Sequence, residues 1–477
     1  MVFSSTIFLF LFLPVVLALY FALRPGLRNG WLLLASLTYY AWGESTFLGL
    51  VLLSIFGNYL FGLALQRLQA ALPRKLMLAF AVSANIGLLV WYKYANFLAG
   101  SLNDLLLLAH SQHAPIILAP IALPLGISFF TFHALSYVVD IYRRQAVAQR
   151  SLPLLCLYIL FFPQLIAGPI VRYHEISDQL SQRKVDVTDL AAGIERFVVG
   201  LTKKMLIANT AAQTADGIFA VLPADLTAPL AWLGVGAYAI QVYFDFSGYS
   251  DMAIGLARLF GFRFPENFDY PYIARSMTEF WQRWHLSLSR FFRDYLYIPL
   301  GGNRRGRART YVNLATVFLL CGLWHGASWN FVCWGALHGA FLIVERLGLL
   351  RILERTWSPV RHVYCLTVVL ITWVFFRSPN LLVTSQFLHA MVGLGQGAGT
   401  AVRAVNYLDD ECLLALGAGV VFSTPIAAWL KRQLRLPSAA HVALFDLSKL
   451  VTLVVMAVAS AMRLSSGTYN PFIYFRF

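Results

Sequence analysis

Charged side chains are scarce in this sequence. Asp, Glu, Lys and Arg together make up 12% of its 477 residues, and 59% of the residues are hydrophobic. An ordinary soluble domain carries about 25% charged residues. This composition therefore excludes a typical soluble protein and predicts a polytopic membrane protein.

Several other sequence features are missing as well. The five cysteines lie in apolar runs without the regular spacing of a disulfide framework, so we interpret them as small buried hydrophobic residues. The chain has no low-complexity tract, no long linker and no internal repeat of fixed period. We therefore expect a single membrane domain over residues 1–477.

Acidic residues are fewer than basic ones. The chain has 22 Asp and Glu against 37 Lys and Arg, which gives a net charge of +15. The basic residues lie in short loops with no recognition module around them, so we predict no nucleic-acid partner. Cytoplasmic loops that face anionic lipid headgroups account for this excess, and membrane lipids are the expected surroundings.

Apolar runs recur along the chain, and each is close to the roughly 20 residues that a helix needs to cross a bilayer. We predict an all-α fold of roughly ten to twelve spans plus interfacial or re-entrant helices. Clear runs begin near Ile7, Trp31, Phe47, Leu76, Ile116, Leu152, Ala231, Tyr311, Phe331, Val363, Cys412 and Leu450.

The first apolar run predicts the orientation of the chain. It lacks the basic start and the cleavage site of a signal peptide, so we expect a retained span. No Lys or Arg precedes it, whereas Arg24 and Arg28 follow at once. The positive-inside rule then places the N-terminus outside the cytoplasm.

An amphipathic segment begins at Met277. Apolar residues recur at three-and-four spacing up to Tyr295, which predicts one helix lying at the interface or lining a cleft. His285 lies on the flank of this expected helix. A surface anchor without chemistry, with His285 as an interfacial filler, is the alternative at this point.

A basic loop, GGNRRGRAR, follows the amphipathic segment. Arg304, Arg305 and Arg307 offer forked donors that suit phosphate oxygens. Arginine clusters beside membrane segments are also ordinary topology signals, so both interpretations stay open.

His325 lies in CGLWHGASWNFVCWGALHG, within apparent membrane sequence. Titratable side chains at such positions usually face the protein interior or a wet cavity and are functional candidates. Gly322 and Gly326 flank it with room for another backbone or a ligand. A histidine that only hydrogen-bonds between two helices is the alternative.

Three chemistries are conceivable for His325. Zinc hydrolysis is disfavoured because no HExxH pattern occurs and His338 is thirteen residues away, about 220° around a helix. A Cys321–His325 nucleophile is disfavoured because a thiolate forms poorly in an apolar site. Acyl transfer needs only one imidazole, a thioester and an acceptor hydroxyl. We therefore favour acyl transfer and predict no metal.

The stretch YFDFSGYSD carries two carboxylates, Asp245 and Asp251. Six residues apart on a helix they diverge by about 120°, so we expect no catalytic pair. Ser250 or Asp251 is instead expected to cap a helix that begins at Met252. Asn267 and Gln164 are polar residues without a role that the sequence indicates.

Long motifs carry a family resemblance. They are YFDFSGYSDMAIGLARLFGFRFPENFDYPY, FWQRWHLSLSRFFRDYLYIPLGGNR and GLWHGASWNFVCWGALHG, with further similar stretches toward both ends. The chain resembles the membrane-bound O-acyltransferase family, in its bacterial alginate O-acetyltransferase branch. Nearly the whole chain is covered, and the core motifs occupy about residues 120–345.

The resemblance implies a helical membrane enzyme with a central funnel that meets an acyl donor from the cytoplasm and an acceptor on the opposite side. It implies that His325, of the WHG motif, is the essential catalytic residue, and that His285, of the RWH motif, is a second catalytic histidine. His338 matches a frequent histidine with a supporting role at most. Arg304, Arg305 and Arg307 then become expected contacts to coenzyme A phosphates or to an acidic acyl carrier protein.

The function predicted from the resemblance is acetyl transfer across the bacterial inner membrane for O-acetylation of an exopolysaccharide. The expected donor is acetyl-coenzyme A or a carrier-bound phosphopantetheine thioester, no cofactor is expected to stay bound, and the expected partner is a periplasmic acetyltransferase. D-alanyl transfer from a carrier protein is the nearest alternative. A transporter or flippase, and a scaffold of an export complex, are alternatives of other classes.

Overall fold

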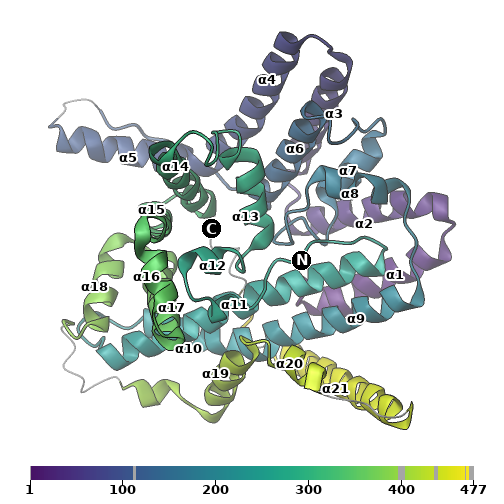
Figure 1. Ribbon diagram of the computed structural model, residues 1–477. Helices are drawn as coiled ribbons and strands as arrows, with labels where there is room; N and C mark the ends of the chain where they lie inside the picture. Colours follow the sequence, from purple (N-terminus) through teal and green to yellow (C-terminus); the bar gives the residue numbers. More distant parts are fainter. Residues whose placement is uncertain (1, 111–113, 396–402, 434–438, 468, 472–477) are drawn as a thin grey trace. The chain divides into compact units, whose positions relative to one another are not determined.

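The computed structural model describes residues 2–110, 114–395, 403–433, 439–467 and 469–471 (Figure 1). All regular secondary structure in these residues is helical, which confirms the predicted all-α class. The chain divides into two compact units. The first comprises Met1–Leu190 and Ala257–Pro265, and the second comprises Ala191–Leu256 and Glu266–Phe477.

Helices of the first unit pack through both apolar and polar contacts. Asn58 and Asn85 exchange two side-chain amide hydrogen bonds of 2.8 and 3.0 Å between two helices, which satisfies both buried amides. The helices of this unit are α1 (Leu13–Ala22), α2 (Arg28–Gly43), α3 (Leu48–Arg67), α4 (Ala71–Leu89), α5 (Ala95–Leu108), α6 (Ile127–Tyr142), α7 (Leu152–Leu160) and α8 (Tyr173–Ser181).

The second unit contains the segments that the sequence singled out. Its helices before the basic loop are α9 (Val187–Thr202), α10 (Asn209–Phe219), α11 (Ala228–Leu259), α12 (Met277–Trp281) and α13 (Leu286–Phe292). The first residues of α9 and the last residues of α11 belong to the first unit. Its later helices are α14 (Arg307–His325), α15 (Trp329–Val344), α16 (Leu350–Arg355), α17 (Ser358–Arg377), α18 (Leu381–Met391), α19 (Asp410–Phe422), α20 (Ile426–Gln433) and α21 (Ala439–Ser465).

Four helical stretches of the described chain are long and apolar enough to cross a membrane. They are Leu48–Arg67, Ala71–Leu108, Ser358–Arg377 and Ala443–Ser465. Phe8–Ala22, Ile127–Tyr142 and Leu381–Met391 are apolar but shorter. Length and composition alone identify these stretches, so the total of roughly ten to twelve spans stays a prediction.

The apolar run expected to begin a helix near Ile116 does not do so. Residues 114–123 lie outside any helix, and α6 begins only at Ile127. Pro115, Pro120 and Pro124 explain the difference, because each lacks the backbone N–H that a helix interior needs. Likewise, the run at Leu152 forms only the nine-residue α7, too short to span a bilayer.

Glycines bring α14 and α15 into backbone contact. A Cβ atom added to Gly335 would lie 3.1 Å from the Cα of Gly322 and closer still to the carbonyl oxygen of Phe318. One added to Gly322 would overlap the carbonyl oxygen of Phe331. The room predicted beside Gly322 is therefore filled by the α15 backbone, as in other close helix pairs of membrane proteins.

This contact predicts that Gly335→Ala destabilises the protein. The added methyl group overpacks the α14–α15 interface, at an expected cost of about 1–3 kcal/mol. Gly236→Ala on α11 is the matched control, because nothing lies within 4 Å of the Cβ position there. Thermal unfolding of the detergent-solubilised protein measures both variants. An unfolding midpoint for Gly335→Ala equal to that of Gly236→Ala would contradict the packing argument.

Candidate active site

His325 is the last residue of α14 and is 6% exposed. Three aromatic rings from three helices surround its imidazole. The ring centroids of Trp324, Trp334 and Phe376 lie 4.9, 5.0 and 5.2 Å from that of His325, all in edge-on arrangements. This aromatic enclosure limits the orientations of the imidazole and surrounds it with apolar surface.

His285 does not lie on the flank of a continuous helix, as the sequence periodicity predicted. The segment breaks into α12, α13 and a π-helical turn at Arg293–Tyr297, and His285 occupies the left-handed region at the junction, with φ 44° and ψ 56°. Only a few per cent of non-glycine residues adopt this conformation, and such residues cluster at functional sites. The imidazole is completely buried.

The side-chain amide of Asn267 holds the His285 ring. Its Nδ2 donates to the Ser250 hydroxyl at 2.9 Å, and its Oδ1 accepts from the backbone N–H of Ser287 at 3.2 Å. These two bonds fix which end of the amide is oxygen. Nδ1 of His285 lies 3.0 Å from that oxygen and must therefore be the protonated nitrogen. The lone pair of the neutral ring is then on Nε2.

Burial also favours the neutral form of His285. It lowers the pKa of this histidine to about 3, because the apolar surroundings penalise the charged imidazolium. His285 lies between two short helices rather than within a long apolar one. A neutral ring with an available lone pair has the protonation state that a general base or a hydrogen-bond acceptor requires.

The structure brings the two predicted histidines to the same indole. The ring of Trp324 lies 6.3 Å from that of His285 and 4.9 Å from that of His325, measured between centroids. Both imidazoles belong to the second unit: His325 follows Trp324 directly in α14, whereas His285 comes from the junction of α12 and α13. They therefore form one cluster, which could not be inferred from their separation of forty residues.

His338 lies further along the same aromatic cluster. Its Nδ1 accepts a hydrogen bond from the Trp281 indole at 3.2 Å, and its ring is 4.6 Å from that of Trp334. Trp334 thus separates His338 from His325. This placement agrees with the predicted supporting role, which stays a prediction.

The expected capping role of Ser250 and Asp251 is wrong. Both residues lie inside α11, which runs unbroken from Ala228 to Leu259. Asp251 instead pairs with Arg196 and Lys203, each at 2.7 Å, while Asp245 pairs with Lys204 at 2.8 Å. As expected, the two carboxylates do not form a pair with each other.

The polar residues without a predicted role separate in the structure. Asn267 anchors His285. Gln164 belongs to the first unit, where its side-chain Nε2 donates a hydrogen bond to the backbone carbonyl of Tyr158. The importance of Asn267 had no local sequence signal, because its partners His285 and Ser287 lie 18 and 20 residues further along the chain.

Of the three predicted donor-binding arginines, one lines a pocket and two do not. Arg307 begins α14 and lines a pocket with residues of the π-helical turn Glu345–Leu349 and of α16. Arg304 and Arg305 are exposed and do not line this pocket. Within the described residues, no group of three His, Cys, Asp or Glu side chains could hold a metal ion.

Comparisons with known proteins identify the family. The model of the membrane-bound O-acyltransferase family matches residues 34–385. The chain belongs to this family. It is 40% identical to a probable alginate O-acetylase AlgI of Azotobacter vinelandii over the full length of both chains. It is 37% identical to a peptidoglycan O-acetyltransferase of Helicobacter pylori, with 83% of this chain and 80% of the relative covered.

A relative of lower sequence identity is named for the transfer of a different acyl group, D-alanine. A teichoic acid D-alanyltransferase of Bacillus subtilis is 28% identical over 53% of this chain and 66% of its own length. The family and the O-acetyltransferase relatives make this chain a membrane-bound O-acetyltransferase.

The Asn267 contact predicts that Asn267→Ala slows acetyl transfer by about 10-fold or more, because the His285 ring loses its fixed orientation. Asn267→Asp keeps an acceptor oxygen at the same place and is expected to retain more activity. Its carboxylate favours the imidazolium and so raises the pKa of His285. The acidic limb of the rate profile should then move to higher pH. Rates measured between pH 5 and pH 8 (roughly the range of histidine titration) check both outcomes.

If Asn267→Asp and Asn267→Ala lose activity equally and show the wild-type pH profile, then Asn267 only stabilises the fold and does not position His285.

Proposed function

We propose that this protein transfers an acetyl group from a cytoplasmic thioester across the bacterial inner membrane, for O-acetylation of an exopolysaccharide such as alginate. The observation that carries the proposal is the contact of two buried histidines, His285 and His325, with the indole of Trp324. The full-length similarity to a probable alginate O-acetylase supports the substrate class.

In the proposed reaction, His325 acts as general base. It takes the proton of the acceptor hydroxyl while the hydroxyl oxygen bonds to the carbonyl carbon of the thioester. The carbon–sulfur bond then breaks, and the imidazolium returns the proton to the departing thiolate sulfur. The products are an acetyl ester and a free thiol, so atoms and charges balance.

His285 has a complementary part in this proposal. Its Nε2 keeps a lone pair because Asn267 holds the proton on Nδ1. It can therefore accept a hydrogen bond from the protonated form of His325 or from the acceptor hydroxyl and orient that group. The surrounding aromatic side chains exclude water, which would otherwise hydrolyse the thioester.

A covalent route is a second form of the same function. The imidazole of His325 can itself attack the thioester, and the acetyl group then passes from nitrogen to the hydroxyl oxygen. In either route we propose a periplasmic N-terminus and a periplasmic acetyltransferase as the partner that completes polymer modification. Transfer of D-alanine is less favoured, because that relative is less similar and covers about half of the chain.

The proposal predicts that His325→Ala folds but loses acetyl transfer, with a fall of about 100-fold to 10,000-fold, the range that general base catalysis contributes. Purified protein incubated with labelled acetyl-coenzyme A and an oligosaccharide acceptor measures free thiol and ester product together. His389→Ala removes an exposed histidine of α18 and is the matched control. Release of thiol by the His325→Ala variant at the control rate would remove this residue from the mechanism.

A further inference from the structure

The second unit has a pocket with three arginines in its lining. It has a volume of about 460 Å³ and is lined in part by Arg307, Arg346 and Arg351, together with Asn303 and Tyr311. This volume is within the range of roughly 300–1,000 Å³ that small-molecule sites occupy. The pocket is therefore large enough to hold a small ligand rather than a single ion.

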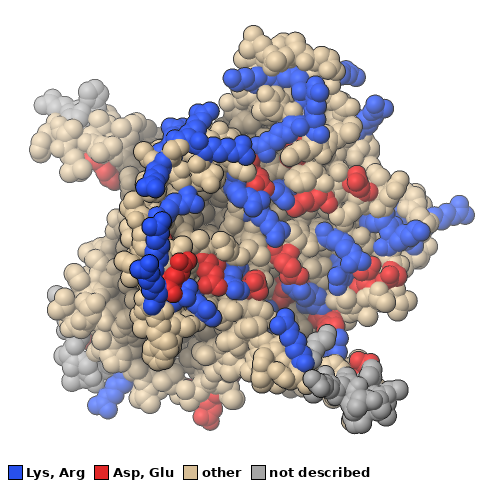
Figure 2. Space-filling view, viewed as in Figure 1, with Lys and Arg blue, Asp and Glu red and all other residues tan. Residues whose placement is uncertain are grey.

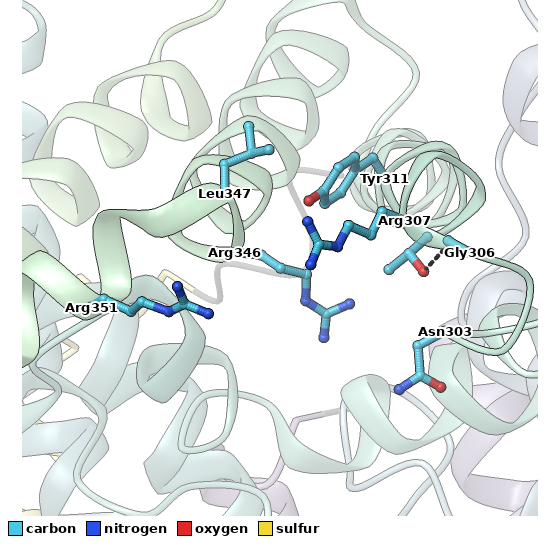
Figure 3. A pocket seen from close by; sticks show the side chains of 8 residues that line it. Asn303, Gly306, Arg307, Tyr311, Arg346, Leu347 and Arg351 are labelled. Atoms are coloured by element: carbon cyan, nitrogen blue, oxygen red, sulfur yellow. Dashed lines mark hydrogen bonds between the residues drawn. The ribbon is translucent and has the colours of Figure 1, made fainter.

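The three arginines approach the pocket from different elements. Arg307 is the first residue of α14, Arg346 lies in the π-helical turn Glu345–Leu349, and Arg351 lies in α16. In the close-up view, the guanidinium groups of Arg307 and Arg346 extend into the same space, and Arg351 reaches toward it from α16 (Figure 3). Three like charges around one pocket repel one another unless an anion lies between them.

No carboxylate neutralises these three side chains among the residues that the structure describes. Glu345, the neighbour of Arg346 in sequence, is directed elsewhere. Its two oxygens accept from the backbone N–H groups of Met277 and Thr278 at 2.6 and 2.9 Å, so this carboxylate caps the start of α12. The positive charge of the pocket is thus available to a ligand.

The start of α14 adds to this preference for an anion. No side chain caps the helix, its first turn contains no acidic residue, and Gly306 precedes it with φ 85°. The positive end of the helix dipole is therefore added to the charge of Arg307. Figure 2 shows Lys and Arg side chains gathered over the face formed by α14 and α16.

The same helix connects this pocket to the catalytic candidate. Arg307 is its first residue and His325 its last, and 19 helical residues place them about 27 Å apart along the axis. A ligand that serves both places must carry phosphates at one end and a thioester at the other end of a long arm. Coenzyme A thioesters have this form.

We propose that the Arg307–Arg346–Arg351 pocket binds the phosphate groups of the acyl donor, a coenzyme A thioester, whose arm extends toward His325. This inference rests on the proposed function for the direction of the arm. Guanidinium groups form paired hydrogen bonds to phosphate oxygens, and Tyr311 and Asn303 supply further polar contacts. The cluster of arginines also places this end of α14 in the cytoplasm by the positive-inside rule.

The test compares two donors that differ only in phosphate. Acetyl-coenzyme A carries the phosphates, and S-acetylpantetheine carries the same thioester without them. We expect the pocket variant Arg346→Gln/Arg351→Gln to raise the KM for acetyl-coenzyme A by about 10-fold or more, with kcat nearly unchanged. The KM for S-acetylpantetheine should stay within about 2-fold of the wild-type value.

The matched control is Arg309→Gln/Arg355→Gln, which removes the same charge from two exposed arginines that do not line the pocket. It should leave the KM for both donors near the wild-type values. An equal rise in the KM for acetyl-coenzyme A in the control and in the pocket variant would mean that only the general surface charge matters. An unchanged KM in the pocket variant would mean that the phosphates bind elsewhere. Either result overturns the proposal.

Direct binding separates this inference from the proposed function. Calorimetry with adenosine 3′,5′-bisphosphate should show binding to the wild-type protein and weaker binding to the pocket variant, whether or not any acetyl group is transferred. If no thioester yields free thiol with the wild-type protein, the proposed function fails while this measurement still tests the pocket.

Two further measurements test whether a different ligand occupies the pocket. Binding is repeated in nanodiscs of phosphatidylcholine with and without phosphatidylglycerol. If phosphatidylglycerol removes nucleotide binding completely, the pocket belongs to a lipid headgroup and the proposal is wrong. It is also wrong if a loaded acyl carrier protein serves as donor while acetyl-coenzyme A does not.

Discussion

The amide of Asn267 is the contact on which the geometry of the candidate site depends. His285 lies in a left-handed conformation at a break between two short helices, where the backbone alone would leave its ring free to rotate. Asn267 receives three hydrogen bonds at one oxygen, from the ring of His285 and from both the backbone and the hydroxyl of Ser287. One side chain thus fixes the position of the ring and the location of its proton.

Aromatic packing provides the rest of the framework. Trp324 contacts both His285 and His325, and Trp334 contacts both His325 and His338. Planar rings hold imidazoles at defined angles while adding few polar atoms, which suits the proposed transfer from a thioester that water would hydrolyse. The close α14–α15 contact at Gly322 and Gly335 holds Trp324 and Trp334 on neighbouring helices.

Features that depend on local composition could be predicted from the sequence. Features that depend on contacts between residues far apart in the chain could not. Hydropathy and the flanking glycines correctly indicated that His325 is buried on a helix beside another backbone. The break at His285 was not predictable, because Phe280, Trp284 and Leu288 keep a helical spacing on both sides of it. The anchoring by Asn267 depends on a hydrogen bond across 18 residues, which no periodicity reveals.

The arginines and lysines show why a net charge alone could not locate a binding site. Lys203 and Lys204 are neighbours in sequence, yet they neutralise two different carboxylates of α11, Asp251 and Asp245. The second of these pairs is almost completely buried, so its two charges compensate each other inside the protein and are unavailable to a ligand. Arg346 and Arg351 differ because Glu345 is already committed to the start of α12. Which basic side chains remain available for a ligand therefore depends on which of them are paired with the few acidic residues. This pairing is defined only in the folded chain.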